Sequence, residues 1–285
     1  MNKDFMPPAL LTFPQFDPFI FRLNLSFAKI GLSWYAFMYL VGFVIGYFVI
    51  RYRYRSGALR LPNAEGVSLL VTYCFYGLIL GARIFYIIFY NPVFYFHHAW
   101  EIPAIWHGGM SFHGGLLGTI FAMWMFSRRM KIPMFMVSDT IGLCAPIGLF
   151  FGRIGNFING ELWGRVAEVP WAMVFPSGGP LPRHPSQLYE ALLEGLVLSL
   201  VLWSLNWMKA RPGVISAMLL IGYGALRFIV EFFREPDAQL GFLFLHLTMG
   251  QLLCATMVVM GFVVLAFAYR WPKSFFPKPP PSDAR

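Results

Sequence analysis

The sequence predicts an all-α, polytopic integral membrane protein with about seven transmembrane helices. Apolar residues make up 58% of its 285 positions and charged residues only 12%, about half of the roughly 25% that is usual in soluble domains. The apolar residues also gather into long stretches, most of which reach the roughly 20 residues that a spanning helix needs. These stretches are Ser33–Ile50, Gly66–Tyr90, Gly114–Phe126, Ile132–Phe151, Gln187–Met208, Gly213–Phe233 and His246–Ala268.

The third stretch, Gly114–Phe126, is shorter than the others. Three explanations stay open at this point: the helix begins earlier, it is tilted, or it lies against a re-entrant segment. Its boundaries are therefore the least defined of the seven.

Basic residues predict the orientation of these helices. They follow the first, third, fifth and seventh stretches, at Arg51, Arg53, Arg55, Arg60, Arg128, Arg129, Lys131, Lys209, Arg211, Arg270, Lys273, Lys278 and Arg285. Because cytoplasmic loops carry the excess of Lys and Arg, we expect the C-terminus in the cytoplasm and the N-terminus outside. The formal net charge of +9 is then mostly a topology signal that also attracts anionic lipid, and we expect no nucleic-acid partner.

The regions that flank the spans divide the chain into three parts. Residues 1–32 contain four prolines and no uninterrupted apolar core, so they are expected to form an external arm and not a cleavable signal. The aromatic residues of this arm, Phe13, Phe16, Phe19 and Phe21, are expected at the membrane interface. Residues 33–270 are predicted to form a single transmembrane domain with external loops, and the proline-rich residues 271–285 a disordered cytoplasmic tail.

The cysteines offer no obvious chemistry of their own. Cys74, Cys144 and Cys254 all fall inside apolar stretches, so we expect neither a nucleophilic thiol nor a disulfide. The chain also shows no nucleotide-binding loop and no spacing typical of metal ligands. We therefore expect no cofactor and no metal.

Polar side chains gather where the fourth stretch ends. They are Arg153, Asn156, Asn159, Glu161 and Arg165, with several glycines between them. Charges at bilayer depth are costly, so such residues usually line a cavity or pathway. The alternative is a glycine-rich packing face with an arginine that reaches the headgroups, but packing alone does not require the polar residues that follow.

The sixth stretch carries a second polar group. Tyr223, Arg227 and Glu231 are spaced four residues apart and Arg234 follows, which places all four on one side of a helix. The simpler alternative is an Arg227–Glu231 ion pair that neutralises itself inside the bundle, although it leaves Tyr223 and Arg234 unexplained.

Arg153 and Arg227 are expected to line one polar cavity that opens towards the external leaflet. The reason is that two buried arginines lie on separate spans with no surplus of carboxylates nearby. Arg83, inside the second stretch, fits a structural and a functional role equally well.

Among the histidines, His113 stands apart because Gly114 and Gly115 follow it and permit a tight backbone geometry. The other five are typical structural histidines at span boundaries and loops: His97, His98, His107, His184 and His246.

Four blocks of this sequence resemble the bacterial prolipoprotein diacylglyceryl transferases. They run from Met110 to Leu116 (Met-Ser-Phe-His-Gly-Gly-Leu), from Gly152 to Arg165 (Gly-Arg-Ile-Gly-Asn-Phe-Ile-Asn-Gly-Glu-Leu-Trp-Gly-Arg), from Arg183 to Glu190 (Arg-His-Pro-Ser-Gln-Leu-Tyr-Glu) and from Gly222 to Arg234. The blocks keep the order of the family and cover most of the chain.

The resemblance implies transfer of the diacylglyceryl group of phosphatidylglycerol to the lipobox cysteine of a preprolipoprotein signal peptide. The product is a thioether, glycerol phosphate leaves, and the enzyme lies in the bacterial inner membrane with its site towards the periplasmic leaflet. The polar residues suit this reaction, because Arg153 and Arg227 can grip a phosphate that gains negative charge. His113 is the candidate general base for the thiol, unless the field of the arginines activates the thiol and His113 only orients groups.

The remaining site residues are expected to bind or orient the substrates. Asn156 and Tyr223 can donate neutral hydrogen bonds to lipid headgroup oxygens, whereas Glu161 and Glu231 orient the arginines. Tyr35 is similar to a tyrosine of the family that lies near the external mouth. The resemblance adds Asn159, Gly164, Arg165 and Arg234 to the binding residues.

Two other classes of function remain open on composition alone. A membrane transporter or lipid-translocating protein also carries buried Arg and Glu, but many transporters have duplicated halves or paired broken spans, which this chain lacks. A structural or assembly factor leaves the clustered arginines unexplained.

Overall fold

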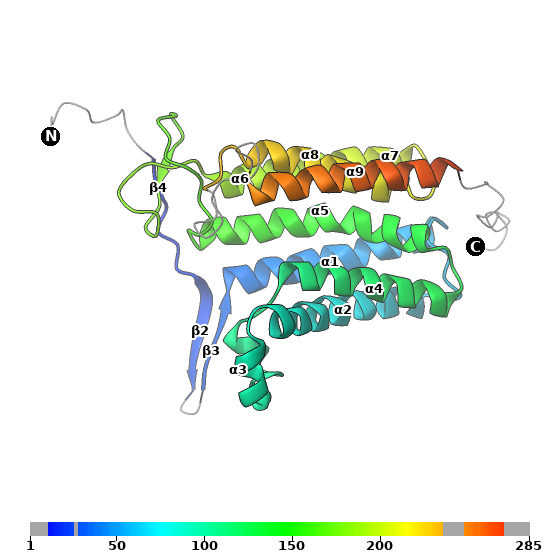
Figure 1. The fold of residues 1–285 in the computed structure, drawn as a ribbon, viewed down its shortest axis with the longest axis horizontal. Helices are drawn as coiled ribbons and strands as arrows, with labels where there is room; N and C mark the ends of the chain where they lie inside the picture. Colours follow the sequence, from blue (N-terminus) through cyan, green and yellow to red (C-terminus); the bar gives the residue numbers. More distant parts are fainter. Residues whose placement is uncertain (1–10, 26–27, 236–247, 271–285) are drawn as a thin grey trace. The chain divides into compact units, whose positions relative to one another are not determined.

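The structure is a computed structural model that describes residues 11–25, 28–235 and 248–270. In this part the chain is mostly helical (Figure 1). The long helices are α1 (Trp34–Arg55), α2 (Glu65–Phe89), α4 (Phe112–Met130), α5 (Met134–Ile158), α7 (Leu198–Trp207), α8 (Val214–Val230) and α9 (Met249–Arg270). Shorter turns are α3 (Pro92–His97), η1 (Ala99–Glu101), η2 (Ile105–His107), α6 (Ser186–Glu190) and the π-helical segment η3 (Ala191–Val197).

Each of the seven apolar stretches coincides with a helix, the fifth with the continuous run α6–η3–α7. Within the described residues, five helical segments are long and apolar enough to cross a membrane: α1, α2, α5, the run Ser186–Trp207 and α9. α8 is apolar but has only 17 residues, and α4 is not among the five. A helical membrane protein is thus confirmed, whereas seven spans and their orientation stay predictions.

Helix α4 begins earlier and ends later than its apolar stretch indicates. The Ser111 hydroxyl accepts the amide hydrogen of Gly114 at 3.3 Å and caps the first turn. At the other end Lys131 adopts a left-handed conformation with φ of 54°. Of the explanations left open, the earlier start is therefore correct, and the helix has 19 residues.

The described chain forms two compact units, here called the first unit (residues 11–46 and 141–270) and the second unit (residues 47–140). α1 and α5 each contribute a part to both. The expected beginning of the external arm and the expected disordered tail, residues 1–10 and 271–285, lie outside the described residues.

The second unit is built on a close antiparallel pairing of α2 and α4 (Figure 1). Gly77 and Gly81 of α2 face Gly114 and Gly118 of α4, and a Cβ at any of these positions would collide with the backbone or a side chain opposite. Small residues at this spacing let two membrane helices approach closely. The sequence suggested that Gly114 permits a tight backbone geometry beside His113. In the structure Gly114 instead allows the close packing of two helices.

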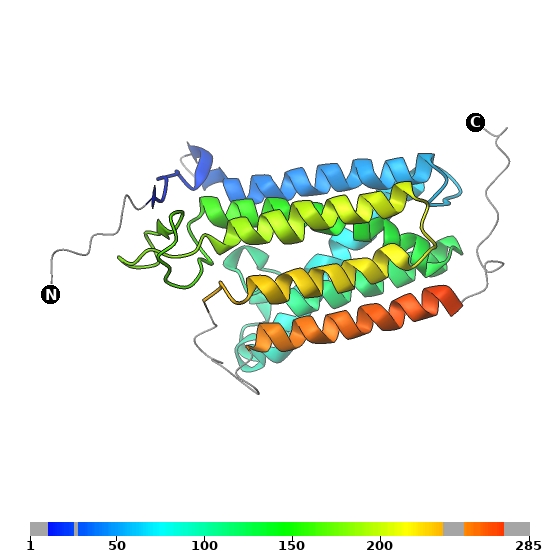
Figure 2. The same ribbon diagram turned by 90° about the horizontal axis from the view of Figure 1, so that it is seen from above.

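In the first unit α8 and α9 lie side by side (Figure 2). Gly224 of α8 faces the backbone around Cys254 and Val258 of α9, and Gly195 of η3 lies against Phe150 of α5. Gly222 of α8 lies against Leu198, the first residue after η3, and η3 also contacts α8. α5, η3 and α8 are thus close together, and all three carry charged residues.

Four short strands belong to the first unit. β1 (Leu11–Thr12) pairs in parallel with β4 (Met173–Val174), and β2 (Phe19–Leu25) forms an antiparallel hairpin with β3 (Ala28–Ser33) that leads into α1 (Figure 1). Of the four arm aromatics that are expected at the membrane interface, Phe13 is packed inside the protein. Its side chain is 9% exposed and packs against Phe157 and Phe175.

Candidate active site

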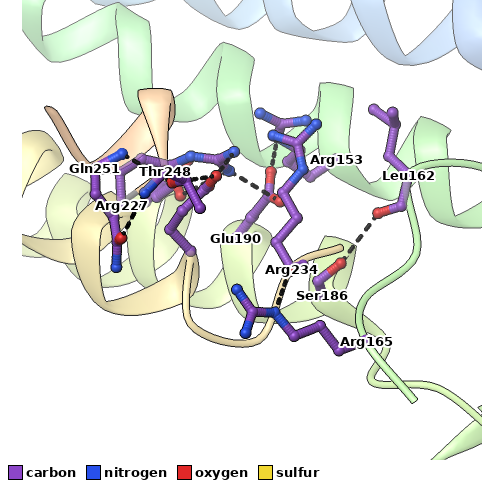
Figure 3. Close-up of polar contacts among 11 residues, drawn as sticks. Arg153, Leu162, Arg165, Ser186, Glu190, Arg227, Arg234, Thr248 and Gln251 are labelled. Atoms are coloured by element: carbon purple, nitrogen blue, oxygen red, sulfur yellow. Dashed lines mark hydrogen bonds and ion pairs between the residues drawn. The ribbon is translucent and has the colours of Figure 1, made fainter. Parts of the chain in front are cut away.

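The two arginines singled out by the sequence meet at one buried carboxylate in the first unit (Figure 3). Arg153 Nε lies 2.5 Å from Glu190 Oε2, and Arg227 Nη1 lies 2.9 Å from Glu190 Oε1. The Glu190 side chain is fully buried. The arginines are thus brought together, as predicted, by a residue that was not among the predicted site residues.

Arg227 has two further carboxylate partners. Its Nη2 lies 3.1 Å from Glu231 Oε2, and its Nη1 lies 3.5 Å from Oε1 of Glu194, which is also fully buried. We call these five residues, Arg153, Glu190, Glu194, Arg227 and Glu231, the arginine–carboxylate cluster. The expectation of no surplus of carboxylates was wrong, because three carboxylates surround two arginines.

The Arg227–Glu231 ion pair, the simpler alternative for the sixth stretch, does exist, but it is part of this larger cluster. The cluster is held by the π-helical segment that follows α6. Glu190 ends α6 and Glu194 lies inside η3, and π-helical turns within α-helices often mark functional sites. The sequence signal for both was present, since two acids four residues apart interrupt the apolar stretch Gln187–Met208 and such charges suggest a functional site.

Glu231 is fixed from α9 by a capping arrangement. The Thr248 hydroxyl donates to Glu231 Oε1 at 3.2 Å and also accepts the amide hydrogen of Gln251 at 3.2 Å. The Gln251 side chain accepts the amide hydrogen of Thr248 at 3.0 Å in return. This is a capping box, and it ties the first turn of α9 to the cluster.

Arg234 does not share a helix face with Tyr223 and Arg227, which corrects the prediction. α8 ends at Val230, and Arg234 instead forms a bridge with Gly164. The reason is a loop contact: the amide of Arg165 donates to the carbonyl of Phe233 at 2.9 Å and draws the chain away from the helix. Figure 3 shows the Arg234 side chain extending towards Arg153.

Gly164 and Arg165 hold the chain segment that follows α8. Arg165 Nε donates to the Arg234 carbonyl at 2.8 Å, so its interpretation as a binding residue gains no direct support. A Cβ on Gly164 would meet the Phe233 carbonyl and His184. Gly164 is therefore needed for the close approach of two chain segments, which explains its place in the motif.

The Asn156–Glu161 turn lies at the end of α5. Asn156 Nδ2 donates to Glu161 Oε1 at 2.8 Å, and Asn159 Nδ2 donates to the same oxygen at 3.3 Å. Glu161 is exposed, whereas Asn156 is only 7% exposed. The two amides thus orient the carboxylate of Glu161, and its predicted role of orienting an arginine has no direct contact behind it in the described residues.

Next to this turn, Leu162 has a φ of 58°, rare for a residue other than glycine, and its carbonyl accepts the Ser186 hydroxyl at 3.0 Å (Figure 3). Backbone strain of this kind is often found at functional sites.

Two tyrosines approach the arginines in the first unit. Tyr35 packs against Gly155, its hydroxyl lies 3.1 Å from that of Tyr39, and it interacts electrostatically with Arg153 and Glu161. Tyr223 interacts electrostatically with Arg227 and Glu194. Both residues therefore lie near the arginines, and their role in substrate binding stays a prediction.

His113 belongs to the second unit, in the first turn of α4. Its side chain is exposed and has no hydrogen-bond partner among the residues that the structure describes. An imidazole in this state has both ring nitrogens available for an incoming group.

Arg83, also in the second unit, has a structural role. Its guanidinium donates to the carbonyls of Ile102 at 2.9 Å and Gly109 at 3.0 Å, and to those of Glu101, Ala104 and Gly108. It also lies over the ring of Tyr95. Of the two roles left open, Arg83 thus builds the loop that precedes His113.

Comparison with known proteins agrees with this geometry. The family model of prolipoprotein diacylglyceryl transferase matches residues 22–267. Proteins named phosphatidylglycerol–prolipoprotein diacylglyceryl transferase are similar to the chain: one from Nitratidesulfovibrio vulgaris (strain DP4) is 49% identical over 257 residues, 90% of this chain and 96% of that protein. One from Rhodospirillum rubrum is 48% identical over 264 residues, 91% and 95% of the two chains. One from Bordetella avium is 48% identical over 265 residues, 92% and 98% of the two chains. The chain therefore belongs to the prolipoprotein diacylglyceryl transferase family.

Proposed function

We propose that the protein transfers the diacylglyceryl group of phosphatidylglycerol to the lipobox cysteine thiol of a preprolipoprotein. The observation that carries this proposal is the family match over residues 22–267, together with the names of relatives that cover nine-tenths of the chain. The partly buried Arg153 and the buried Arg227 support it, because the reaction requires cations where a phosphate leaves.

In the reaction, the thiolate attacks the glyceryl carbon and the C–O bond to the phosphate breaks. The electron pair of that bond stays on the phosphate oxygen, so glycerol phosphate leaves with one more negative charge than the phosphodiester carried. The thiol proton is released. The protein therefore needs a cationic group at the phosphate and a base at the thiol.

Arg153 is the better placed of the two arginines for direct contact with phosphate. Only its Nε is engaged, by Glu190, and its two terminal nitrogens have no hydrogen-bond or ion-pair partner within the described residues. Both terminal nitrogens of Arg227 face carboxylates. We therefore assign the phosphate contact to Arg153 and a positioning role to Arg227, with Asn156, Tyr35 and Tyr223 as neutral donors around the headgroup.

His113 is proposed as the general base that takes the thiol proton. Support comes from its exposure and from its unengaged ring nitrogens. A histidine with a pKa near 6.5 is well matched to this task. The alternative, thiol activation by the field of the arginines, is an outcome that the His113 variant described in the Discussion distinguishes.

We further propose a seven-span topology in the bacterial inner membrane, with the N-terminus and the site on the periplasmic side. In the second unit, Arg128 and Arg129 lie at the end of α4 opposite to His113, as expected if that end faces the cytoplasm. A reporter enzyme fused after Pro281 should behave as a cytoplasmic protein. Periplasmic activity of that reporter would contradict the orientation.

The function is tested with purified protein, phosphatidylglycerol and a synthetic signal peptide that carries one lipobox cysteine. The expected result is a peptide with a diacylglyceryl thioether and an equal amount of released glycerol phosphate. A peptide with serine in place of cysteine should give neither product. Movement of lipid between leaflets of a vesicle without any modified peptide would instead support the lipid-translocating alternative.

A further inference from the structure

Among the carboxylates of the arginine–carboxylate cluster, Glu194 has the longest contact with a cation. Arg227 Nη1 donates to its Oε1 at 3.5 Å, and that nitrogen lies closer to Glu190, at 2.9 Å. The other oxygen, Oε2, is buried without any hydrogen-bond partner, and the side chain is fully buried. A carboxylate in such surroundings is costly, whereas the neutral acid is much less so.

The other two carboxylates are better supported as anions. Glu190 lies within ion-pair distance of both arginines, although neither contact has hydrogen-bond geometry. Glu231 has Arg227 at 3.1 Å and the Thr248 hydroxyl at 3.2 Å. The charge of the cluster agrees with this ranking, since three carboxylates and two guanidinium groups leave one negative charge uncompensated, and one proton would remove it.

We propose that the arginine–carboxylate cluster holds one exchangeable proton on Glu194, which keeps the cluster neutral and able to accept an anionic lipid headgroup. The second half of this statement rests on the proposed function. If Glu194 loses its proton, the cluster gains a negative charge next to the phosphate that Arg153 must bind. Loss of the proton should therefore weaken the binding of phosphatidylglycerol.

The titratable and charged groups around Glu194 come from every neighbouring element of the first unit. They are Arg153 on α5, Glu190 on α6, Tyr223 and Arg227 on α8, Glu231 after α8 and Cys254 on α9. The Arg234 side chain extends towards Arg153 in Figure 3 and has no carboxylate partner in the cluster. None of these groups donates a hydrogen bond to Oε2 of Glu194.

The proton is tested by infrared difference spectroscopy on the whole protein in detergent. At neutral pH the wild-type protein should show the carbonyl-stretch band of a buried protonated carboxyl group. Glu194→Gln should remove this band, and the variant should fold because an amide closely resembles the neutral acid. Asp139→Asn is the matched control, since Asp139 is a buried carboxyl residue of the second unit, only 2% exposed, and its replacement should leave the band in place.

Two spectroscopic outcomes would overturn the proposal: no such band in the wild-type protein, or a band that persists in Glu194→Gln. Absence of the band in the wild-type protein overturns the proposal even if the variant does not fold.

The consequence for lipid binding is tested separately, by the KM for phosphatidylglycerol as a function of pH. The wild-type KM should rise at alkaline pH, by about tenfold for a loss of 1.4 kcal/mol in binding, whereas that of Glu194→Gln should stay flat. A band that disappears in Glu194→Gln together with a KM that is flat in both proteins would show that the proton exists but that the headgroup binds elsewhere. That result would count against the proposed phosphate site and leave the proton assignment intact.

Discussion

Two buried arginines of this protein are satisfied in opposite ways. Arg83 in the second unit is 5% exposed and surrounded by five backbone carbonyls. Arg227 in the first unit is 7% exposed and surrounded by three carboxylates. Carbonyls cannot change their charge, so Arg83 fixes one loop conformation. Carboxylates can take up protons and exchange partners, so the charge around Arg227 can change where the charge around Arg83 cannot.

A buried charge in a membrane protein can have a structural role or a functional role. Such a residue is a functional candidate by default, and both arginines qualify on sequence alone. The structure distinguishes them by their partners. We therefore expect replacement of Arg83 to act on stability, and replacement of arginines in the arginine–carboxylate cluster to act on activity.

The largest effect is expected for Arg83→Met. The substitution leaves five carbonyls of residues 101–109, most of them partly buried, without the Arg83 donors, and each unsatisfied buried group costs about 1–3 kcal/mol. Water will reach some of them, so the free energy of unfolding should fall by about 4 kcal/mol. Thermal unfolding in detergent measures this loss. Proteolysis should also cut between residues 99 and 111 earlier than in the wild-type protein.

Arg129→Met is the matched control in the same unit. Arg129 donates one hydrogen bond to the Tyr73 hydroxyl at an exposed site, and its loss should change stability by no more than about 0.5 kcal/mol. If both variants lose the same free energy of unfolding, Arg83 does not stabilise the loop as predicted.

Arg153→Lys should lower turnover by about 10²–10³-fold, the usual loss when a donor to a developing charge is removed. Lysine keeps the charge and can still pair with Glu190, but it cannot present two parallel donors to a phosphate. Stability should therefore change little. Transfer of diacylglyceryl to the lipobox peptide measures turnover, and thermal unfolding measures stability. The control is Arg22→Lys, because Arg22 forms an exposed ion pair with Asp17 in the same unit. An equal loss of stability and activity would assign Arg153 a structural role.

His113→Gln should reduce turnover by about 10²-fold at neutral pH, because a general base contributes at least that much. Raising the pH should restore part of the rate at saturating phosphatidylglycerol, since a free thiol with a pKa near 8.5 ionises without help. His97→Gln, another exposed histidine of the second unit, should behave like the wild-type protein. Near-normal turnover of His113→Gln, or no recovery at high pH, would favour thiol activation by the arginines.

The sequence predicted the helices well because apolar length alone specifies a membrane helix. It failed where tertiary contacts decide. α8 ends at Val230, and Gly164 and Arg165 bind the chain beyond it. The apolar Phe232 and Phe233, followed only later by Pro236, indicate a longer helix. The β2–β3 hairpin was missed because the prolines that precede it indicate an irregular arm.

The site was predicted in part. Arg153 and Arg227 were correctly placed together, since charges in apolar spans are rare enough to stand out. Glu190 and Glu194 were missed although they lie in such a span, because phosphate binding suggested cations and gave no reason to look for anions. Their contact with Arg227 depends on the π-helical segment η3, which no local sequence pattern indicates.

The smallest effect is expected from His184, which lies in the loop between β4 and α6 of the first unit and tests whether neutral partners suppress a charge there. Its Nδ1 lies 3.0 Å from the Tyr189 hydroxyl and its ring contacts Phe233. Partial burial lowers the pKa of His184 below its ordinary value of 6.5.

The folded protein then binds fewer protons than the unfolded chain, so this contribution to stability is complete above pH 6.5 and is lost as the pH falls from 6.5 through the lowered pKa. His184→Gln should remove that slope from the unfolding free energy measured between pH 7 and pH 5. An unchanged slope in the variant would mean that other groups carry the acid sensitivity of the first unit.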